Sequence, residues 1–339
     1  MLTEPNQVGK REDLLDVLYR IDNRNTPFIT MLNSGAAPQN FLLEWPVDTH
    51  FAPRDASYVG GEDVAEFRNH ADERAILRTY LQNFREASMV SRDAVEVSNV
   101  AGVPDELGEA IEKMMVAIKR DMEATFLSSQ EHQAESGAGT PYLARGLGNW
   151  LLDTANISSQ TLYQVPEAFR PAAAQYVTTA TASLTDDSIN TVLQSIFDTS
   201  GMPQDTMYLL AGSVLRARFT EMTRTVQSAT TNTFESTANF NYDGNTRRVE
   251  KTTDVYQGDF GTVQIEVCSY IGSDMTASTL TTDTDRGYLV DMDKLQCRWH
   301  KTPTLNRLTD NGGGPRFEIY SRAALQCSNP KAMAQFIPA

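Results

Sequence analysis

Residues 106–127, ELGEAIEKMMVAIKRDMEATFL, have the pattern of one long helix. Apolar side chains recur at intervals of three and four residues and form a single stripe: Leu107, Ile111, Met114, Met115, Ile118, Met122 and Phe126. Glu109 and Lys113 can pair on another face. Val103 and Pro104 suit a start, because proline is accepted in the first turn; over 105–130 the helix would be about 39 Å long. With one apolar stripe, it is expected to lie across a sheet.

The length and composition of the chain are those of a folded protein with room for two lobes. It has 339 residues, of which 40% are hydrophobic and 22% charged, a balance typical of globular proteins at a size where single cores divide. The sequence contains no run of about 18 apolar residues, and MLTEPNQVGKREDLLD lacks the apolar core of a secretion signal. We therefore expect the protein to act in the compartment where it is made.

The net charge narrows the class of partner, and the cysteine content indicates the redox compartment. The chain has 44 acidic and 29 basic residues, a net charge of −15, which disfavours a grip on the phosphate backbone of nucleic acid. Its three cysteines, Cys268, Cys297 and Cys327, are far apart and odd in number. That pattern indicates small buried thiols in a reducing cytoplasm and not a disulfide framework.

A helix and a long arm are predicted before residue 104. Residues 11–24 carry one helical stripe: Leu14, Leu15, Val17, Leu18 and Ile21. In FLLEWPVDTHF, residues 41–51, apolar and polar side chains alternate as in a half-buried strand, and Pro46 indicates an edge strand or a bulge. After a polar stretch, a second extended run returns over residues 75–90. Together they predict a two-stranded arm, which is marginal alone and makes sense if something outside the subunit holds it.

Residues 131–183 are expected to be rich in loops, and a second, α/β unit is predicted from residue 184. Thr185 can cap a helix with the stripe Ile189, Val192, Leu193, Ile196 and Phe197. MYLLA, residues 207–211, predicts a short buried strand, and Ser213 can cap a helix that carries Val214, Leu215, Phe219 and Met222. A hairpin follows, with strands at 249–257 and 263–271 around a turn at 258–261. Alternating strands over 295–300 and 316–327 close the chain.

The sequence offers no convincing catalytic, cofactor-binding or metal site, and we assign none. The four histidines, His50, His70, His132 and His300, are not spaced as zinc ligands. GLGNWL, residues 146–151, lacks the third glycine of a dinucleotide-binding loop and follows a loop, so it is interpreted as loop. Cys268 has no paired base nearby, which disfavours a nucleophile.

Three further groups have a functional and a structural interpretation. The carboxylates Asp283, Asp285, Asp291 and Asp293 are hard ligands suited to a divalent ion, but their spacing does not match a calcium loop and favours a solvated surface; whether an ion binds there stays open. Trp45 and His50 fall on opposite faces of their predicted strand, which indicates core and surface. Met114, Met115 and Met122 suit a docking surface, but packing against a sheet is the better interpretation.

The order of these parts resembles the major capsid proteins of tailed bacteriophages, with the fold named after phage Hong Kong 97, and in particular the major capsid family that includes phage SU-ten. The segments that carry the resemblance are DLLDVLYRIDNRNTPFITML, FLLEWPVD, ELGEAIEKMMVAIKRDMEATFL and VYQGDFGTVQIEV. The resemblance covers nearly the whole chain, and the order and spacing of the segments are more specific than any one segment. It implies an α+β fold with an N-arm, an extended β-hairpin E-loop, a long spine helix, a P-domain sheet and an inserted α/β A-domain.

The resemblance also implies domain boundaries. These are 1–40 for the N-terminal arm, 41–90 for the E-loop, 91–183 for the first part of the P-domain with the spine helix at 104–130, 184–284 for the A-domain, and 285–339 for the second part of the P-domain. Long strands at 287–300 and 316–328 would lie beside the spine helix. No residues here match the Lys–Asn pair that links subunits of the founding phage covalently.

By the same resemblance, the protein would be a non-enzymatic major capsid protein that forms hexamers and pentamers of an icosahedral head around double-stranded DNA. Its partners would be copies of itself, a portal at one vertex and a separate scaffolding protein, since the N-arm motif begins within a dozen residues of Met1 unless an upstream piece is removed. Decoration proteins stay open, and no membrane is implied. Assembly would take place in the bacterial host cytoplasm, and the protein would end up in the virion.

Three other classes of protein fit parts of the pattern. A non-viral compartment shell of the same fold would enclose cargo enzyme and not DNA. A tail or decoration protein would form a small ring or trimer, and an enzyme would need a pocket where titratable groups converge, for which this histidine-poor sequence offers no candidate. The symmetry and the contents of purified particles discriminate between these classes.

Overall fold

The computed structural model describes most of the chain. The described residues are 24–55, 57–58, 60–61, 63–64, 67–71, 74–96, 105–137, 139–153, 155, 165–200, 204–222, 242–243, 246–247, 254–276 and 279–337. The predicted helix over 11–24, the proposed helix start at Val103 and Pro104, and the first residues of the predicted hairpin lie outside this set, apart from Arg24, which is not helical.

The long helix α3 spans Glu106–Phe126 and ends earlier than the predicted residue 130. Asp105 is its N-cap, and the Asp105 side chain accepts the backbone N–H of Leu107 at 3.0 Å. The expected stripe is buried at Met114, Ile118, Met122 and Phe126. Over most of its length one face of the helix packs, as its sequence pattern predicts. From Met122 to Phe126 the helix is buried on every side, which the pattern did not predict.

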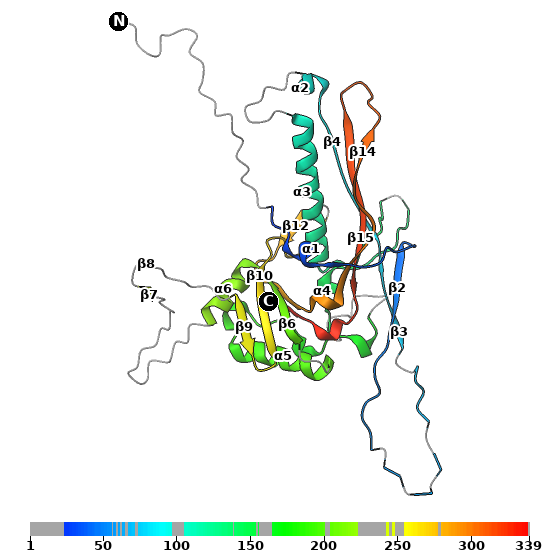
Figure 1. Cartoon of the computed structure of the whole chain (residues 1–339), viewed down its shortest axis with the longest axis vertical. Helices are drawn as coiled ribbons and strands as arrows, with labels where there is room; N and C mark the ends of the chain where they lie inside the picture. Colours follow the sequence, from blue (N-terminus) through cyan, green and yellow to red (C-terminus); the bar gives the residue numbers. More distant parts are fainter. Residues whose placement is uncertain are drawn as a thin grey trace.

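A four-stranded sheet supports α3, with the strand order β1-β14-β15-β4. Its strands are β1 Asn33–Ser34, β4 Gln82–Met89, β14 Leu295–Leu308 and β15 Arg316–Cys327. β15 pairs antiparallel with both β14 and β4, from Arg316 opposite Met89 to Ala323 opposite Gln82. Figure 1 shows α3 running alongside β4 and the long β14–β15 hairpin.

The arm is shorter than the sequence pattern suggested. Its strands are β2 Leu42–Val47 and β3 Ala75–Tyr80, which pair antiparallel in a sheet of their own. The single extended run predicted over 75–90 is wrong, because it divides at Leu81 and its second half, β4, joins the four-stranded sheet. Tyr80 and Leu81 are both buried, which breaks the two-residue alternation, and the Leu81 N–H donates to Phe41 O at 2.9 Å.

The second sheet has six strands in the order β5-β16-β13-β6-β10-β9. They are β5 Tyr176–Val177, β6 Gln204–Ala211, β9 Val255–Gly258, β10 Gly261–Val267, β13 Gly287–Val290 and β16 Ala334–Phe336. Helices α5 Asp186–Ser200 and α6 Ser213–Met222 pack on it. Most of the expected stripes are buried, although Phe197 and Val214 are exposed. The predicted hairpin turn is confirmed by the pairing of Gly258 with Gly261.

The strand expected over 287–300 is two strands in different sheets. β13 ends at Val290 in the six-stranded sheet, and β14 begins at Leu295 in the four-stranded sheet. A 3-10 turn, Met292–Lys294, separates them, and the Asp291 carboxylate caps it by accepting the N–H of Asp293 at 3.0 Å. The capped turn separates the two strands where periodicity alone suggests continuity.

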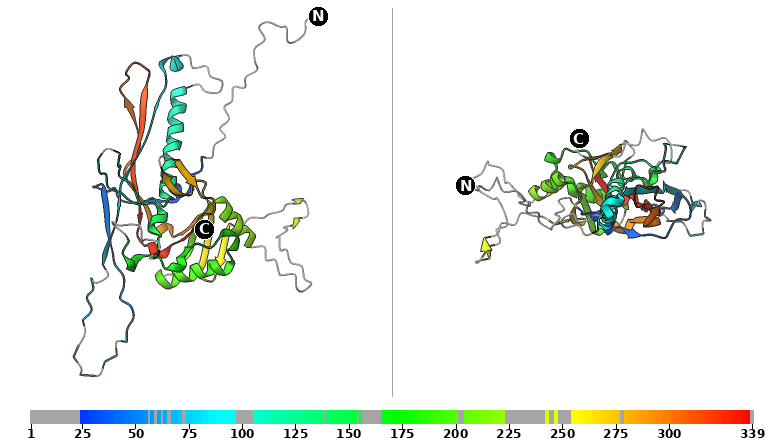
Figure 2. Two further views of the ribbon diagram at one scale, coloured as in Figure 1. Left: turned by 180° about the vertical axis from the view of Figure 1, so that it is seen from behind. Right: turned by 90° about the horizontal axis from the view of Figure 1, so that it is seen from above.

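The other elements are short. They are α1 Pro27–Met31, α2 Arg92–Glu96, α4 Leu147–Trp150, the 3-10 turns Glu167–Phe169, Ala173–Gln175, Thr181–Ser183 and Pro330–Ala332, and the two-stranded pairs β7 Tyr242–Asp243 with β8 Thr246–Arg247 and β11 Gly272–Thr276 with β12 Thr279–Thr282. Figure 2 shows the arm and the β14–β15 hairpin leaving the body at opposite ends.

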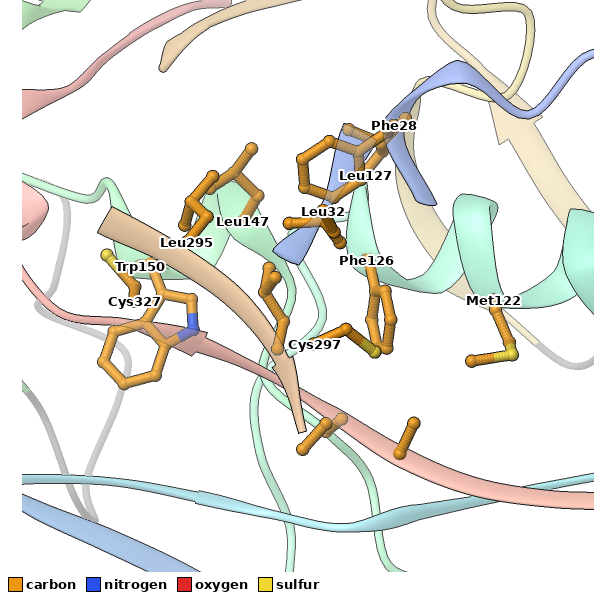
Figure 3. Close-up of a cluster of buried hydrophobic side chains, with 14 of the residues drawn as sticks. Phe28, Leu32, Met122, Phe126, Leu127, Leu147, Trp150, Leu295, Cys297 and Cys327 are labelled. Atoms are coloured by element: carbon orange, nitrogen blue, oxygen red, sulfur yellow. The ribbon is translucent and has the colours of Figure 1, made fainter. Parts of the chain in front are cut away.

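Two hydrophobic cores hold the molecule together. The larger joins α1, α3, the arm base and the four-stranded sheet, and Figure 3 shows Phe28 and Leu32 beside Phe126 and Leu127. The smaller lies between α5, α6 and the six-stranded sheet. β6 contributes Leu210 to the first core and Leu209 to the second. A strand buried on both faces has a continuous apolar run, which explains the sequence MYLLA.

Candidate assembly surfaces

The histidines do not form a site. His50, His70 and His300 are exposed on separate elements, and His132 is buried. In the described part of the chain, no three His, Cys, Asp or Glu side chains come together as metal ligands. His132 accepts a hydrogen bond from Arg145 Nε at 3.0 Å. Burial and the positive charges of Arg145 and Arg78 lower the pKa of His132 to about 3, so it is neutral.

Arg145 is a buried cation that no pattern in the sequence singles out. It is 1% exposed, and its guanidinium lies 4.5 Å from the ring centroid of Trp150. Its backbone N–H donates to Thr79 Oγ1 of β3 at 3.0 Å. Arg145 thus joins the base of the arm to the loop before α4. A cation stacked on tryptophan within a core is stabilising. The hydrogen bonds of Arg145 to Thr79 and His132 join segments far apart in the chain, so they leave no periodic pattern in the sequence.

The carboxylate group of residues 283–293 has structural roles. Asp283 accepts the N–H of Asp285 at 3.2 Å and lies 3.7 Å from Arg286, while Asp291 caps the turn before β14. Two of the four carboxylates therefore form turns of the backbone.

The segment GLGNWL is packed against the end of α3 and includes the four-residue helix α4, so the prediction of a loop is wrong. A Cβ at Gly146 would collide with the carbonyl oxygen of Ser128, and a Cβ at Gly148 would lie 2.6 Å from Ser129 Oγ. The glycines allow close packing of two chain segments and do not form a loop for phosphate.

The cysteines are structural, as the sequence indicates. Cys268, Cys297 and Cys327 are free and buried. Burial raises the pKa of the Cys297 thiol to about 12, and it also raises the pKa of Cys268 and Cys327. A buried thiol with a raised pKa is a poor nucleophile.

The arm presents apolar side chains to solvent. Its base is fixed by an ion pair between Arg78 and Glu44, 3.3 Å apart, and by the buried side chains of Trp45 and Leu77. Beyond the paired strands, large apolar side chains are uncovered: Phe51, Tyr58, Val64 and Phe67 are 54%, 81%, 64% and 86% exposed. Uncovered aromatic side chains on an extended segment mark a contact surface.

The face of the four-stranded sheet that points away from α3 is basic. Register and contacts place the cations Arg85, Lys301, Arg316 and Arg322 there, together with the carboxylate Glu318. We call these five residues, with Tyr320, the basic face. Lys301 Nζ lies 5.0 Å from the Tyr320 ring centroid, and Arg322 lies 4.4 Å from that of Phe41.

The basic face is a local exception to the charge of the chain. Its net charge of +3 contrasts with −15 for the whole protein. Because β15 alternates in side-chain direction, Phe317 and Ile319 face the core while these polar residues face outward. Fields from several close cations add, so this face attracts anionic partners.

None of the described helices has the length and apolar character needed to cross a membrane. A family model described as SU10 major capsid protein matches residues 2–338. No curated protein matches this chain significantly.

Several solved structures share the fold of the whole chain. The capsid asymmetric unit of cyanophage A-1(L) is similar at 14% identity and a TM-score of 0.58, over 98% of this chain and 97% of that chain. Mycobacterium phage Che8 is similar at 11% identity and a TM-score of 0.52, over 97% of both chains. The holo-SrpI encapsulin complex of Synechococcus elongatus PCC 7942 is similar at 12% identity and a TM-score of 0.53, over 97% of this chain and 91% of that chain.

These similarities at low identity establish a common fold, and the family model adds a sequence match over almost every residue. The long helix on a four-stranded sheet, the projecting arm and the second α/β unit are the parts that the resemblance implied. The chain has the Hong Kong 97-like capsid fold and belongs to the SU10 major capsid protein family.

Proposed function

We propose that this major capsid protein assembles as hexamers and pentamers into the icosahedral head of a tailed bacteriophage, around double-stranded DNA. The observation that carries the proposal is the arm, which leaves the body with four large apolar side chains uncovered. Burial of such surface stabilises an interface by about 25 cal/mol per Å². Repetition of one such contact from subunit to subunit closes rings and then a shell.

The arm is acidic, and the basic face is a surface of opposite charge that could receive it. Residues 48–74 contain seven carboxylates and three arginines, a net charge of −4, whereas the basic face has a net charge of +3. The arm points away from the four-stranded sheet of its own subunit (Figure 1). The basic face that receives it therefore belongs to another copy. Opposite charges speed the encounter of two such surfaces and select their orientation, and they contribute less to the affinity.

The domain assignment is part of this proposal. The N-terminal arm takes residues 1–40, the E-loop 41–90, the P-domain 91–183 and 285–339 with the spine helix at 104–130, and the A-domain 184–284. α3 and the β14–β15 hairpin support the P-domain assignment, and β6, β9 and β10 with α5 and α6 support the A-domain. The other strands of the six-stranded sheet, β5, β13 and β16, come from outside residues 184–284. β4 lies within 41–90 and pairs with β15.

The remaining partners are proposed from the family. They are a separate scaffolding protein, a portal at one vertex, decoration proteins, and packaged DNA that the acidic chain approaches without a specific grip. Assembly takes place in the host cytoplasm and the product is the virion. A structural and not a catalytic role remains our prediction.

Electron microscopy of the expressed protein, alone and together with its candidate scaffold, tests the proposal. We expect closed icosahedral particles of uniform size in at least one condition. Monomers or small rings under both conditions would instead indicate a tail or decoration protein.

A non-viral compartment shell is the second candidate, since an encapsulin shares the fold over 97% of this chain. Mass spectrometry and nucleic-acid staining of purified particles discriminate the two candidates. A recruited enzyme in place of DNA would favour the compartment, whereas DNA and a portal would favour the phage head.

A further inference from the structure

The last turns of α3 contain a buried carboxylate that holds the start of α1. Glu123 is fully buried. Its two oxygens accept the backbone N–H groups of Phe28 at 3.0 Å and Ile29 at 2.8 Å. N–H groups at a helix start have no partner within the helix, so Glu123 satisfies two of them. The contact fastens the segment before β1 to α3.

The surroundings of Glu123 favour its neutral form. The sequence of α1, PFITM, has no titratable side chain, and no ion pair of Glu123 occurs among the described residues. Its titratable neighbour is the Cys268 thiol, whose pKa is raised by burial and by this carboxylate. Burial raises the pKa of Glu123 to about 7, although the two amide hydrogen bonds oppose the change.

A second carboxyl group lies on another side of the same turns. Asp121 is two residues before Glu123, about 200° around the helix, and the Glu86 side chain of β4 is close enough to perturb it. Burial, and then the charge and hydrogen bond of Glu86, raise the pKa of Asp121 to about 6. Two carboxyl groups can share a hydrogen bond only while one holds a proton, and ionisation of both leaves like charges in contact.

The nearby cations have other partners. Arg85 pairs with Glu318 on the opposite face of the sheet, Arg120 lies 5.9 Å from the ring centroid of Tyr270, and Arg286 donates to Ser129. The apolar residues that the sheet turns toward α3, Phe84, Phe317 and Ile319, cannot offset a negative charge. Lys119, one turn before Glu123, lies beside Thr26 and Thr30 at the rim of the contact, and among the described residues no cation forms an ion pair with the Glu123 carboxylate. Burial without an ion pair favours a proton as the neutralising group.

We propose that the C-terminal end of α3 is a proton-controlled joint, in which protonated Glu123 keeps α1 fastened to the helix and its ionisation loosens that contact. The joint changes the attachment of residues 24–35 to the body while the paired strands of both sheets stay intact. A shell subunit with such a joint can adjust its N-terminal segment without unfolding.

The direction of the pH dependence follows from which state binds the proton more tightly. With α1 in place the pKa of Glu123 is about 7, and after release the carboxyl group meets water and returns to its ordinary value of 4.5. The fastened state therefore binds the proton more tightly. Its advantage is complete below about pH 4.5 and is lost as the pH rises through about 7.

Hydrogen exchange of the full-length chain at about pH 5 and about pH 8 tests the proposal. After correction for intrinsic exchange rates, protection of the α1 amides should fall by about 70-fold between these conditions, the factor that the pKa change of Glu123 gives over this pH range. Protection of Phe317–Ser321 in β15 should change little. Equal protection of α1 at both pH values, or higher protection at the higher value, would overturn the proposal.

Glu123→Gln is the decisive variant, because its side chain has a similar shape and no charge. We expect it to remove most of the pH dependence of α1 protection, whereas Glu106→Gln, in the first turn of α3, should retain it. A wild-type pH dependence in Glu123→Gln would contradict the role of this carboxylate. Since the comparison of the wild-type chain at two pH values needs no variant, it decides the matter even if Glu123→Gln does not fold.

Discussion

The ring of Phe126, in the last turn of α3, meets the ring of Phe84 on β4 edge-on, with the centroids 6.1 Å apart and the planes at 86°. Edge-on pairs of buried aromatic rings are favourable beyond the area that they bury. Both rings belong to the larger core, together with the stripe of α3. The pair fixes where the helix ends on the sheet, and it places Glu123 and Asp121 between the elements that they join.

Replacement of Ile118 by aspartate should show how much the stripe contributes to stability. Ile118 is fully buried at the middle of α3, so Ile118→Asp places an unpaired charge in the core. We expect the free energy of unfolding to fall by at least about 4 kcal/mol, or the protein to be insoluble. Denaturant titration of this variant and of Lys119→Gln, an exposed neighbour on the helix, measures the difference. A fully stable Ile118→Asp would mean that the stripe is not buried.

Loss of the N-cap of α3 should lower the free energy of unfolding by less than Ile118→Asp does. Asp105→Ala removes the oxygen that accepts the Leu107 N–H, and we expect a cost of about 1 kcal/mol in unfolding free energy. Asp105→Asn retains an acceptor and should cost less than half as much. If both variants unfold like the wild type, the helix start is held by other contacts.

Reversal of charge on the basic face should impair assembly and spare the fold. Lys301→Glu together with Arg322→Glu changes the net charge of this face from +3 to −1, and we expect few shells at low salt because the acidic arm is then repelled. Lys113→Glu together with Lys119→Glu, on the exposed side of α3, makes the same change in net charge elsewhere. Light scattering and electron microscopy compare the two, and equal assembly would exclude the basic face as the receiving surface.

Deletion of the arm tip should separate folding from assembly. Without residues 52–74, joined by a short glycine linker, both cores remain complete. The thermal unfolding midpoint of the subunit should be close to that of the intact chain. Stable shells should not form, because the exposed apolar side chains that cover a neighbour are gone. Normal particles from the deletion variant would contradict the role of the arm in assembly.

Local patterns in the sequence predicted much of this fold. The stripes of α3 and α5 repeat at helical intervals, so their burial follows from periodicity. The buried run of β6 is continuous, and Thr185 is a local capping signal. Thr185 accepts the N–H of Ser188 as the cap requires. These elements are defined by residues close together in the chain.

The sequence did not reveal where strands change sheets. Residues 75–90 and 287–300 each look continuous. The first run is divided at Leu81, which donates to the distant residue Phe41, and the second is divided by a local turn that Asp291 caps. The buried positions of Arg145 and Glu123 were also unpredictable. Arg145 packs on Trp150, five residues along the chain, but its other partners, Thr79 and His132, belong to distant segments. Glu123 binds backbone amides of α1, so no spacing of side chains indicates its role.

The one-residue passage from β3 to β4 gives the subunit a mechanical property. Leu81 is fully buried, and the strands on either side are extended, so the chain has almost no slack between the arm and the sheet. A neighbour that pulls on the arm therefore puts tension on β4, the strand that contacts α3 through Phe84. The subunit can thus transmit strain from its outermost contact to the centre of its own core along a single taut strand.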